Sequence, residues 1–339
     1  MPPMDKNQDF SHFSGLTPDL VLDAVEQAGW IVDGRLLALN SYENRVYQVG
    51  VEDGPPLIAK FYRPERWTDA AIIEEHQFSA ALAQAEIPVV TALPDAQGNT
   101  LRHWQAFRFA VFPRQRGHAP ELHDPATLEW LGRFIGRIHA QGATTCFEHR
   151  PALNIDSFGT EPRAWLLQTP DLIPDELKTT WADTSQRALD QVQRQFDLAG
   201  EVPQIRLHGD CHPGNVLWVD DGDEAGPHFV DFDDARSGPP VQDLWMLLSG
   251  ERADMQAQLG DLLAGYEDFY EFHPRQLYLI EALRTLRLIH YSAWLAQRRF
   301  DPAFVAAFSW FGTPRYWQEK ITELQEQIAA MQAPTLWPV

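Results

Sequence analysis

The sequence predicts an α+β protein built from two lobes, a small antiparallel β lobe followed by a larger helical lobe. Short strand-like runs separated by turn residues are concentrated in the first third of the 339 residues. After a short polar segment at 113–117, long stretches with helical spacing of apolar residues dominate. We therefore expect a β-rich lobe over residues 1–112, a linker over 113–117 and a helical lobe over 118–339.

The β lobe is expected to begin with a helix. Thr17, Pro18 and Asp19 provide an N-cap hydroxyl, a proline in the first turn and an acid near the positive helix end, and Gly29 ends the helix. A second helix is expected from Thr68 to Ala83. Strands are expected at Leu36–Leu39, Arg45–Val49, Leu57–Tyr62, Val89–Val90 and Phe107–Phe112.

The helical lobe is predicted from five segments with amphipathic or fully apolar patterns. These segments are Thr127–Gln141, Glu176–Phe196, Val241–Leu248, Met255–Glu271 and Arg275–Arg299. One β-hairpin interrupts them, formed by Asn215–Val219 and His228–Asp231 around an acidic turn. The last helix carries a stripe of Arg284, Arg287, His290, Tyr291 and Trp294, which we interpret as lobe packing with a polar edge that could line a substrate cleft.

Composition limits the possible partners. There are 27 Lys and Arg residues against 48 Asp and Glu residues, a net charge of −21, which argues against nucleic-acid binding. The charge is compatible with a basic protein or a cationic small molecule as substrate. Two cysteines do not make a disulfide framework, and neither a secretory signal nor an apolar run of membrane length is visible. These features predict a cytoplasmic protein that acts without membrane association.

The segment His208–Asn215, followed by Asp231, carries the strongest chemical signal. An Asp, an Asn five positions later and a further Asp sixteen positions beyond it form the acidic set that phosphoryl transfer from Mg-ATP requires. Asp210 can orient an acceptor hydroxyl and take its proton as the catalytic base. Asn215 and Asp231 offer hard oxygen ligands that suit Mg²⁺ or Mn²⁺. The pattern indicates a kinase that places ATP in the crevice between its lobes.

Two alternatives remain open for this segment. Asp233 lies two residues beyond Asp231 and could replace it as the metal ligand. His208, Asp210 and His212 also form an H-x-D-x-H set, which could bind Zn²⁺ in a metallohydrolase. Such a site would need further ligands, and no comparable second set is found in the sequence.

The β lobe supplies candidate nucleotide contacts. Lys60 lies within an apolar strand and needs an anion, which the phosphates of ATP and Glu75 would provide, with Glu74 as the alternative partner. Ser41, in a turn without glycines, is equally consistent with a phosphate contact and a turn-making role. The backbone around Val111 and Pro113 is expected to meet the adenine.

Several blocks of the sequence resemble the stress response kinase family, bacterial serine/threonine protein kinases of the aminoglycoside phosphotransferase-like superfamily. The resemblance rests on the blocks Asn40–Gln48, Lys60–Trp67, Glu74–Phe78, Leu207–Asn215, Val230–Arg236 and Val241–Leu248. It implies a bilobal protein-kinase-like fold, Asp210 as catalytic base, Asn215 and Asp231 as Mg²⁺ ligands, and Ser41 at the ATP site. It also implies a cytoplasmic monomer that acts in stress response and phosphorylates itself and other proteins on Ser or Thr.

Gly209 is a departure from ordinary protein kinases, which carry an arginine at this position. Only eleven residues separate Asp231 from Asp243, too few for a long activation segment, so we expect activity without phosphorylation of such a segment. Asp243 is expected to brace the catalytic loop. The rival functions are a kinase for homoserine, choline or aminoglycosides with the same site, and a nucleotide-binding regulator without turnover.

Overall fold

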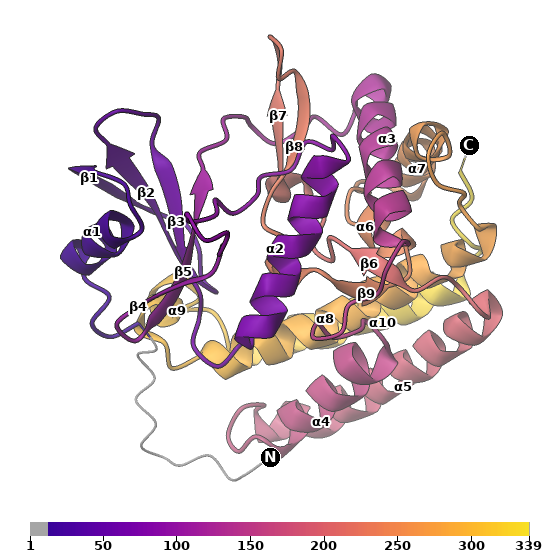
Figure 1. The fold of residues 1–339 in the computed structure, drawn as a ribbon. Coiled ribbons are helices and arrows are strands. Elements are labelled where there is room, and N and C mark those ends of the chain that lie inside the picture. The colour runs from indigo at the N-terminus through magenta and orange to yellow at the C-terminus, as the bar shows by residue number, and fades with distance from the viewer. Residues whose placement is uncertain (1–12, 339) are drawn as a thin grey trace. The chain divides into compact units, whose positions relative to one another are not determined.

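The structure is a computed structural model that describes residues 13–338 (Figure 1). The chain divides into two compact units, one containing residues up to Arg116 together with Phe300–Ala307, and the other containing Gly117–Arg299 and the residues from Phe308 onward. The antiparallel sheet lies in the first unit and most of the helices lie in the second, so the fold is α+β and kinase-like. The range 118–339 predicted for the helical lobe includes 300–307, which the structure groups with the first unit.

The first unit contains a five-stranded antiparallel sheet in the order β1-β2-β3-β5-β4. Its strands are β1 (Val32–Leu39), β2 (Arg45–Val51), β3 (Leu57–Phe61), β4 (Arg102–Trp104) and β5 (Phe107–Pro113). Its helices are α1 (Pro18–Gln27), α2 (Asp69–Gln84) and α9 (Pro302–Ala307). Both α1 and α2 begin where predicted, because the hydroxyls of Thr17 and Thr68 accept hydrogen bonds from the first turns.

The two faces of this sheet differ in burial. One face packs against α1, whose apolar stripe of Leu20, Val21, Ala24 and Val25 meets buried strand residues such as Ala59, Phe61 and Val111. The neighbours of these strand residues point to the opposite face, where Lys60 lies. A second core cluster packs Ile72 of α2 with Tyr62, Leu101 and Ala110, so the unit has buried apolar residues on both faces of the sheet.

The second unit is mainly helical, with two two-stranded sheets, β6-β9 and β7-β8. Its helices are α3 (Pro125–Gly142), α4 (Glu161–Gln168), α5 (Asp175–Ala199), α6 (Val241–Trp245), α7 (Arg252–Tyr266), α8 (Leu279–Arg298) and α10 (Pro314–Gln332). Its strands are β6 (Ile205–Leu207), β7 (Val216–Val219), β8 (Gly226–Phe229) and β9 (Arg236–Gly238). Helices α3 and α7 approach closely at Gly265, which has no side chain. A Cβ atom there would lie only 1.9 Å from the Glu129 carbonyl oxygen.

Several predicted boundaries are wrong. Val89–Val90 is not part of any strand, and the helix predicted at Val241–Leu248 ends at Trp245. The helix predicted from Arg275 begins with the 3₁₀ turn Pro274–Tyr278 before α8. The strands β4, β6 and β9 and the helices α4, α9 and α10 were not predicted. Within residues 13–338, no helix combines the length and the apolar character needed to cross a membrane.

Candidate functional site

The loop that carries Asp210 is held by a buried carboxylate. Asp243 of α6 is 1% exposed, and its two oxygens accept hydrogen bonds from the backbone N–H groups of His208, at 2.8 Å, and Gly209, at 2.9 Å. Buried polar groups need such partners, so the carboxylate and the two amides fix each other. This confirms the prediction that Asp243 braces the loop.

Asp243 is in turn oriented by a histidine whose role the sequence did not reveal. His139 of α3 is fully buried, with Nε2 3.1 Å from Asp243 Oδ2 and Nδ1 2.7 Å from the Tyr266 hydroxyl. Burial raises the pKa of Tyr266, so its hydroxyl stays protonated and donates to Nδ1. The carboxylate of Asp243 can only accept, so Nε2 of His139 donates a hydrogen bond to it.

His208 joins the loop to the segment that contains Asp231. Its Nε2 lies 2.9 Å from the carbonyl oxygen of Val230, and its Nδ1 accepts from the Asp210 N–H at 3.4 Å. The ring also lies against Phe232, with centroids 4.5 Å apart. Both ring nitrogens are thus used within the protein, so His208 braces the loop, and this arrangement gives no support to its being a zinc ligand.

Asn215 and Asp231 are brought together by the β7-β8 hairpin. Val216 pairs with Phe229, and the Val230 N–H donates to the Asn215 carbonyl at 3.0 Å. The Asn215 side-chain amide N–H donates to the Asp210 carbonyl at 2.9 Å, which leaves the amide oxygen as its ligand atom. The structure thus links the three predicted residues through backbone contacts.

Asp231 adopts a backbone conformation that is rare for a residue other than glycine. Its φ of 60° and ψ of 62° lie in the left-handed region, and the residue is exposed. Asp233, by contrast, is 3% exposed, and its backbone carbonyl accepts a hydrogen bond from Arg150. Strained backbone of this kind is frequent at functional sites, and the exposure favours Asp231 over Asp233 as a metal ligand.

The carboxylate of Asp210 has two close neighbours. Its Oδ1 lies 2.7 Å from Nη1 of Arg287, an ion pair without the angles of a regular hydrogen bond, and its Oδ2 lies 3.5 Å from Nε2 of His212. His212 also accepts a hydrogen bond from the Gly214 N–H through Nδ1, and burial lowers the pKa of its imidazole.

Cys211, between Asp210 and His212 in the sequence, is buried, and this burial raises the pKa of its thiol. Within the described residues, no three His, Cys, Asp or Glu side chains form a group suited to holding a metal ion.

In the first unit, Lys60 and Glu75 form the expected pair. Both are buried, and Lys60 Nζ lies 3.9 Å from Glu75 Oε1. The ammonium also lies over the ring of Tyr62, 5.3 Å from its centroid. A buried lysine in a strand is stable only with such anionic or aromatic neighbours, so its charge is held at a defined place on the sheet.

The turn at 40–44 is held by contacts from a buried arginine. Arg63 donates from Nη2 to the Tyr42 carbonyl and from Nε to the Glu43 carbonyl, each at 2.9 Å. Arg63 Nη2 also pairs with Asp301 at 3.0 Å, in the distant segment grouped with this unit. These contacts order a turn that lacks glycines, and Ser41 lies half-buried within it.

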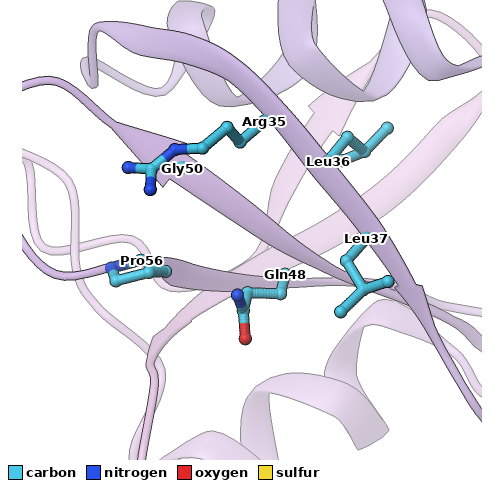
Figure 2. Close-up of a pocket in the computed structure, with 6 residues that line it drawn as sticks. All are labelled: Arg35, Leu36, Leu37, Gln48, Gly50 and Pro56. Atoms are coloured by element: carbon cyan, nitrogen blue, oxygen red, sulfur yellow. The ribbon is translucent and has the colours of Figure 1, made fainter.

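The sheet face that carries Lys60 is apolar and half-exposed. The strand register places side chains from β1, β2 and β3 side by side on this face. One cross-strand row contains Leu37, Gln48 and Ile58, and the next contains Leu39, Val46 and Lys60. The side chain of Leu37 is 56% exposed. Figure 2 shows a small pocket at the end of this face, lined by Arg35, Leu36, Leu37, Gln48, Gly50 and Pro56. A flat aromatic base could stack on such a surface.

Val111 and Pro113 lie at the end of strand β5. The side chain of Val111 is buried in the α1 core, and its carbonyl accepts from the Leu93 N–H at 2.7 Å. Pro113 is exposed and, without an N–H, can offer only its carbonyl. The contact of this backbone with an adenine therefore stays a prediction.

Comparisons with known proteins identify the family of the chain. Residues 35–280 match the description "Phosphotransferase enzyme family" (APH), and the chain belongs to this family. It is 44% identical over 325 residues to "Stress response kinase A" of Escherichia coli (strain K12), and 41% identical over 324 residues to "Serine/threonine protein kinase RdoA" of Salmonella typhimurium (strain LT2). Each alignment covers 96% of both chains. The protein is therefore a phosphotransferase enzyme related to the stress response kinases.

Solved structures share the fold at low sequence identity. An amicoumacin kinase in complex with AMP-PNP, Ca²⁺ and Ami aligns with a TM-score of 0.67 and 17% identity, covering 93% of this chain and 94% of that one. A microcompartment-associated aminopropanol kinase aligns with a TM-score of 0.69 and 18% identity, covering 93% and 97%. These similarities show the bilobal kinase-like fold alone.

Proposed function

We propose that this protein is an ATP- and Mg²⁺-dependent serine/threonine protein kinase that also phosphorylates itself. The observation that carries the proposal is the loop of Asp210 and Asn215, linked through His208 and Val230 to Asp231 and anchored by buried Asp243. A general base, two hard oxygen ligands and a rigid support are the parts that phosphoryl transfer requires.

The residues present fit a magnesium ion. The oriented amide oxygen of Asn215 and the exposed carboxylate of Asp231 are hard ligands from adjacent ends of one hairpin. Magnesium usually takes only one or two protein ligands and completes its shell with water and phosphate oxygens. When bound, the ion would neutralise charge on the nucleotide phosphates.

The residues of each unit would divide the work of transfer. In the first unit, Lys60, held by Glu75, would contact the phosphates, the ordered turn around Ser41 would cover them, and the apolar sheet face would hold the base. In the second unit, Asp210 would accept a hydrogen bond from the acceptor hydroxyl, align it with the γ-phosphorus and take its proton as the new P–O bond forms. The bond from the γ-phosphorus to the bridging oxygen breaks at the same time, and ADP leaves. Holding these groups in place supplies most of the rate enhancement in such reactions.

The protein acceptor is inferred from the curated relatives. One of them, with 41% identity over 96% of this chain, is named a serine/threonine protein kinase. A role in stress response, a cytoplasmic location and a monomeric state are part of the same proposal. The alternative is a kinase for a small molecule, because the structural neighbours include kinases of amicoumacin and aminopropanol.

The test is transfer of label from γ-labelled ATP with Mg²⁺, comparing the wild type with Asp210→Ala and with Asp231→Asn. Each protein is offered itself, a basic test protein and a panel of small hydroxyl compounds. We expect label on Ser or Thr of protein, a loss of at least about 100-fold in Asp210→Ala, and loss of Mg²⁺-dependent nucleotide binding in Asp231→Asn.

Asp221→Asn, in the exposed turn of the same hairpin, serves as the matched control and should behave as the wild type. Label found only in a small compound would move the function to metabolite phosphorylation. ATP binding without any transfer would favour a nucleotide-binding regulator.

A further inference from the structure

We propose that Arg287 of α8 is a positioning residue for phosphoryl transfer, which holds one oxygen of Asp210 so that the other receives the acceptor hydroxyl. The inference rests on the function proposed above. It starts from the 2.7 Å contact between Arg287 Nη1 and Asp210 Oδ1. Neither the catalytic loop motif nor the metal ligands include this arginine, which lies 77 positions further along the chain.

The two oxygens of Asp210 are in different environments. Oδ1 is buried, although the side chain as a whole is 21% exposed, so the accessible surface of the carboxylate lies elsewhere, towards Oδ2. The nearest cationic or imidazole nitrogen to Oδ2 is Nε2 of His212, at 3.5 Å, beyond ordinary hydrogen-bond length. Arg287 therefore covers one oxygen and leaves the other for a hydroxyl.

The helix that carries Arg287 is fixed to the element that anchors the catalytic loop. In the 3₁₀ turn that precedes α8, buried Gln276 accepts a hydrogen bond from the Val241 N–H of α6 at 3.1 Å. One turn before Arg287, the guanidinium of Arg284 lies over the ring of Trp245 of α6, 5.3 Å from its centroid. The helix α6 also carries Asp243, so the ion pair and the loop share one support.

The exposure of the pair argues against a purely stabilising role. Arg287 is 38% exposed, and ion pairs at this exposure contribute little to the free energy of folding. Ordering a long arginine side chain also costs conformational entropy. The remaining consequence of the contact is the orientation of a carboxylate whose direction decides whether an acceptor hydroxyl is aligned for attack.

The experiment compares Arg287→Gln and Arg287→Lys with Arg133→Gln. Arg133 on α3 forms ion pairs with Glu129 at 2.6 Å and with Asp268 at 3.3 Å at similar exposure. Its variant therefore removes the same charge and at least as much ion pairing away from the loop. We measure kcat for transfer, KM for ATP, the dissociation constant of a non-hydrolysable Mg-ATP analogue, and the midpoint of urea denaturation.

For Arg287→Gln we expect kcat to fall about 10- to 100-fold, while the analogue binds within about twofold of the wild type and stability matches Arg133→Gln. Arg287→Lys should recover part of the loss, since it keeps the charge but not the planar fork. In the Asp210→Ala background, Arg287→Gln should cause no further loss, because residues that act as one unit are not additive.

An active wild type with Arg287→Gln at full kcat would overturn this inference alone. Additive losses in the double variant, or a fall in kcat that follows a fall in stability, would also overturn it, because both indicate a structural role. A wild type that transfers phosphate to no acceptor would instead overturn the proposed function, and this inference with it.

Discussion

Gly209 has a φ of +84°, and a Cβ atom built on it would lie 2.2 Å from the carbonyl oxygen of Asp234. We predict that Gly209→Ala destabilises the protein by about 2–4 kcal/mol, the sum of a left-handed conformation and a steric clash. It should also lower kcat strongly, because Asp210 is the next residue. Urea denaturation and the transfer assay measure the two effects.

The matched control for Gly209 is Gly98, which has a similar φ of +88° and no atom near its Cβ position. Gly98→Ala introduces the backbone strain without the clash and should cost only about 1–2 kcal/mol. Equal destabilisation by the two variants would show that the loop can move away from Asp234, and that the arginine of ordinary protein kinases could be accommodated here.

The two cysteines are predicted to differ in reactivity. Burial raises the pKa of Cys211, so its thiol stays protonated and inaccessible, whereas Cys146 is exposed. At pH 8 we expect one thiol to react with a disulfide reagent in the native protein and both to react in urea. Native Cys146→Ser should then be almost unreactive, and rapid labelling of its remaining thiol would contradict the burial of the loop.

The same raised pKa has a consequence for stability. The unfolded chain releases the Cys211 proton near the ordinary pKa of about 8.5, while the folded protein retains it to higher pH. The unfolded state therefore binds fewer protons above that pH, and the free energy of unfolding falls as pH rises. Cys211→Ala should lose this part of the alkaline decrease.

At the level of elements, capping residues and apolar spacing predicted the long helices well. The same local features predicted short strands, which depend on pairing with another strand, poorly. An N-cap threonine followed by proline begins both α1, at Thr17-Pro18, and α10, at Thr313-Pro314. Strands β6 and β9 have three residues each, too few for a period-two pattern, and exist because they pair with each other. Val89–Val90 has strand propensity but joins no named strand, so propensity alone misled the prediction.

The difference between local signals and contacts made only in the fold also applies to the candidate site. Asp210, Asn215 and Asp231 could be proposed from sequence because their side-chain chemistry and spacing in one loop and hairpin imply a reaction. The roles of His139 and Asp301 could not be predicted in this way, because each acts through a contact with a residue far along the chain. His139 and Asp243 are 104 positions apart, and Arg63 and Asp301 are 238 positions apart. Such contacts depend on the tertiary fold and leave no local pattern.

The turn at 40–44 gives a prediction at this scale. Asp301 is 7% exposed and lies 3.0 Å from Arg63 and 3.5 Å from Arg45. Asp301→Asn keeps the shape but removes the charge between two guanidinium groups, so we expect a loss of about 1–3 kcal/mol in stability. A looser turn should raise KM for ATP about 3- to 10-fold with little change in kcat.

Asp95→Asn changes a half-buried acid whose carboxylate accepts hydrogen bonds in the turn before β4, and it tests whether any lost charge in the first unit has this effect. We expect its KM for ATP to match the wild type. If Asp301→Asn lowers kcat and leaves KM unchanged, the arginine network does not act through the nucleotide turn.

The whole molecule carries a net charge of −21, and this field predicts a preference among acceptors. A basic protein should be drawn to the enzyme and meet it faster than an acidic protein of similar size, because attraction between opposite net charges raises the encounter rate. We expect kcat/KM to be higher for the basic acceptor at low ionic strength, and the advantage to shrink as salt rises to about 0.5 M, where the Debye length is only a few ångströms. A pair of test proteins that share one phosphorylatable segment and differ only in surface charge separates this long-range effect from recognition at the site. Equal rates on both members at low salt would show that acceptor choice depends on local contacts, among which the face of α8 around Arg287 would be the first to examine.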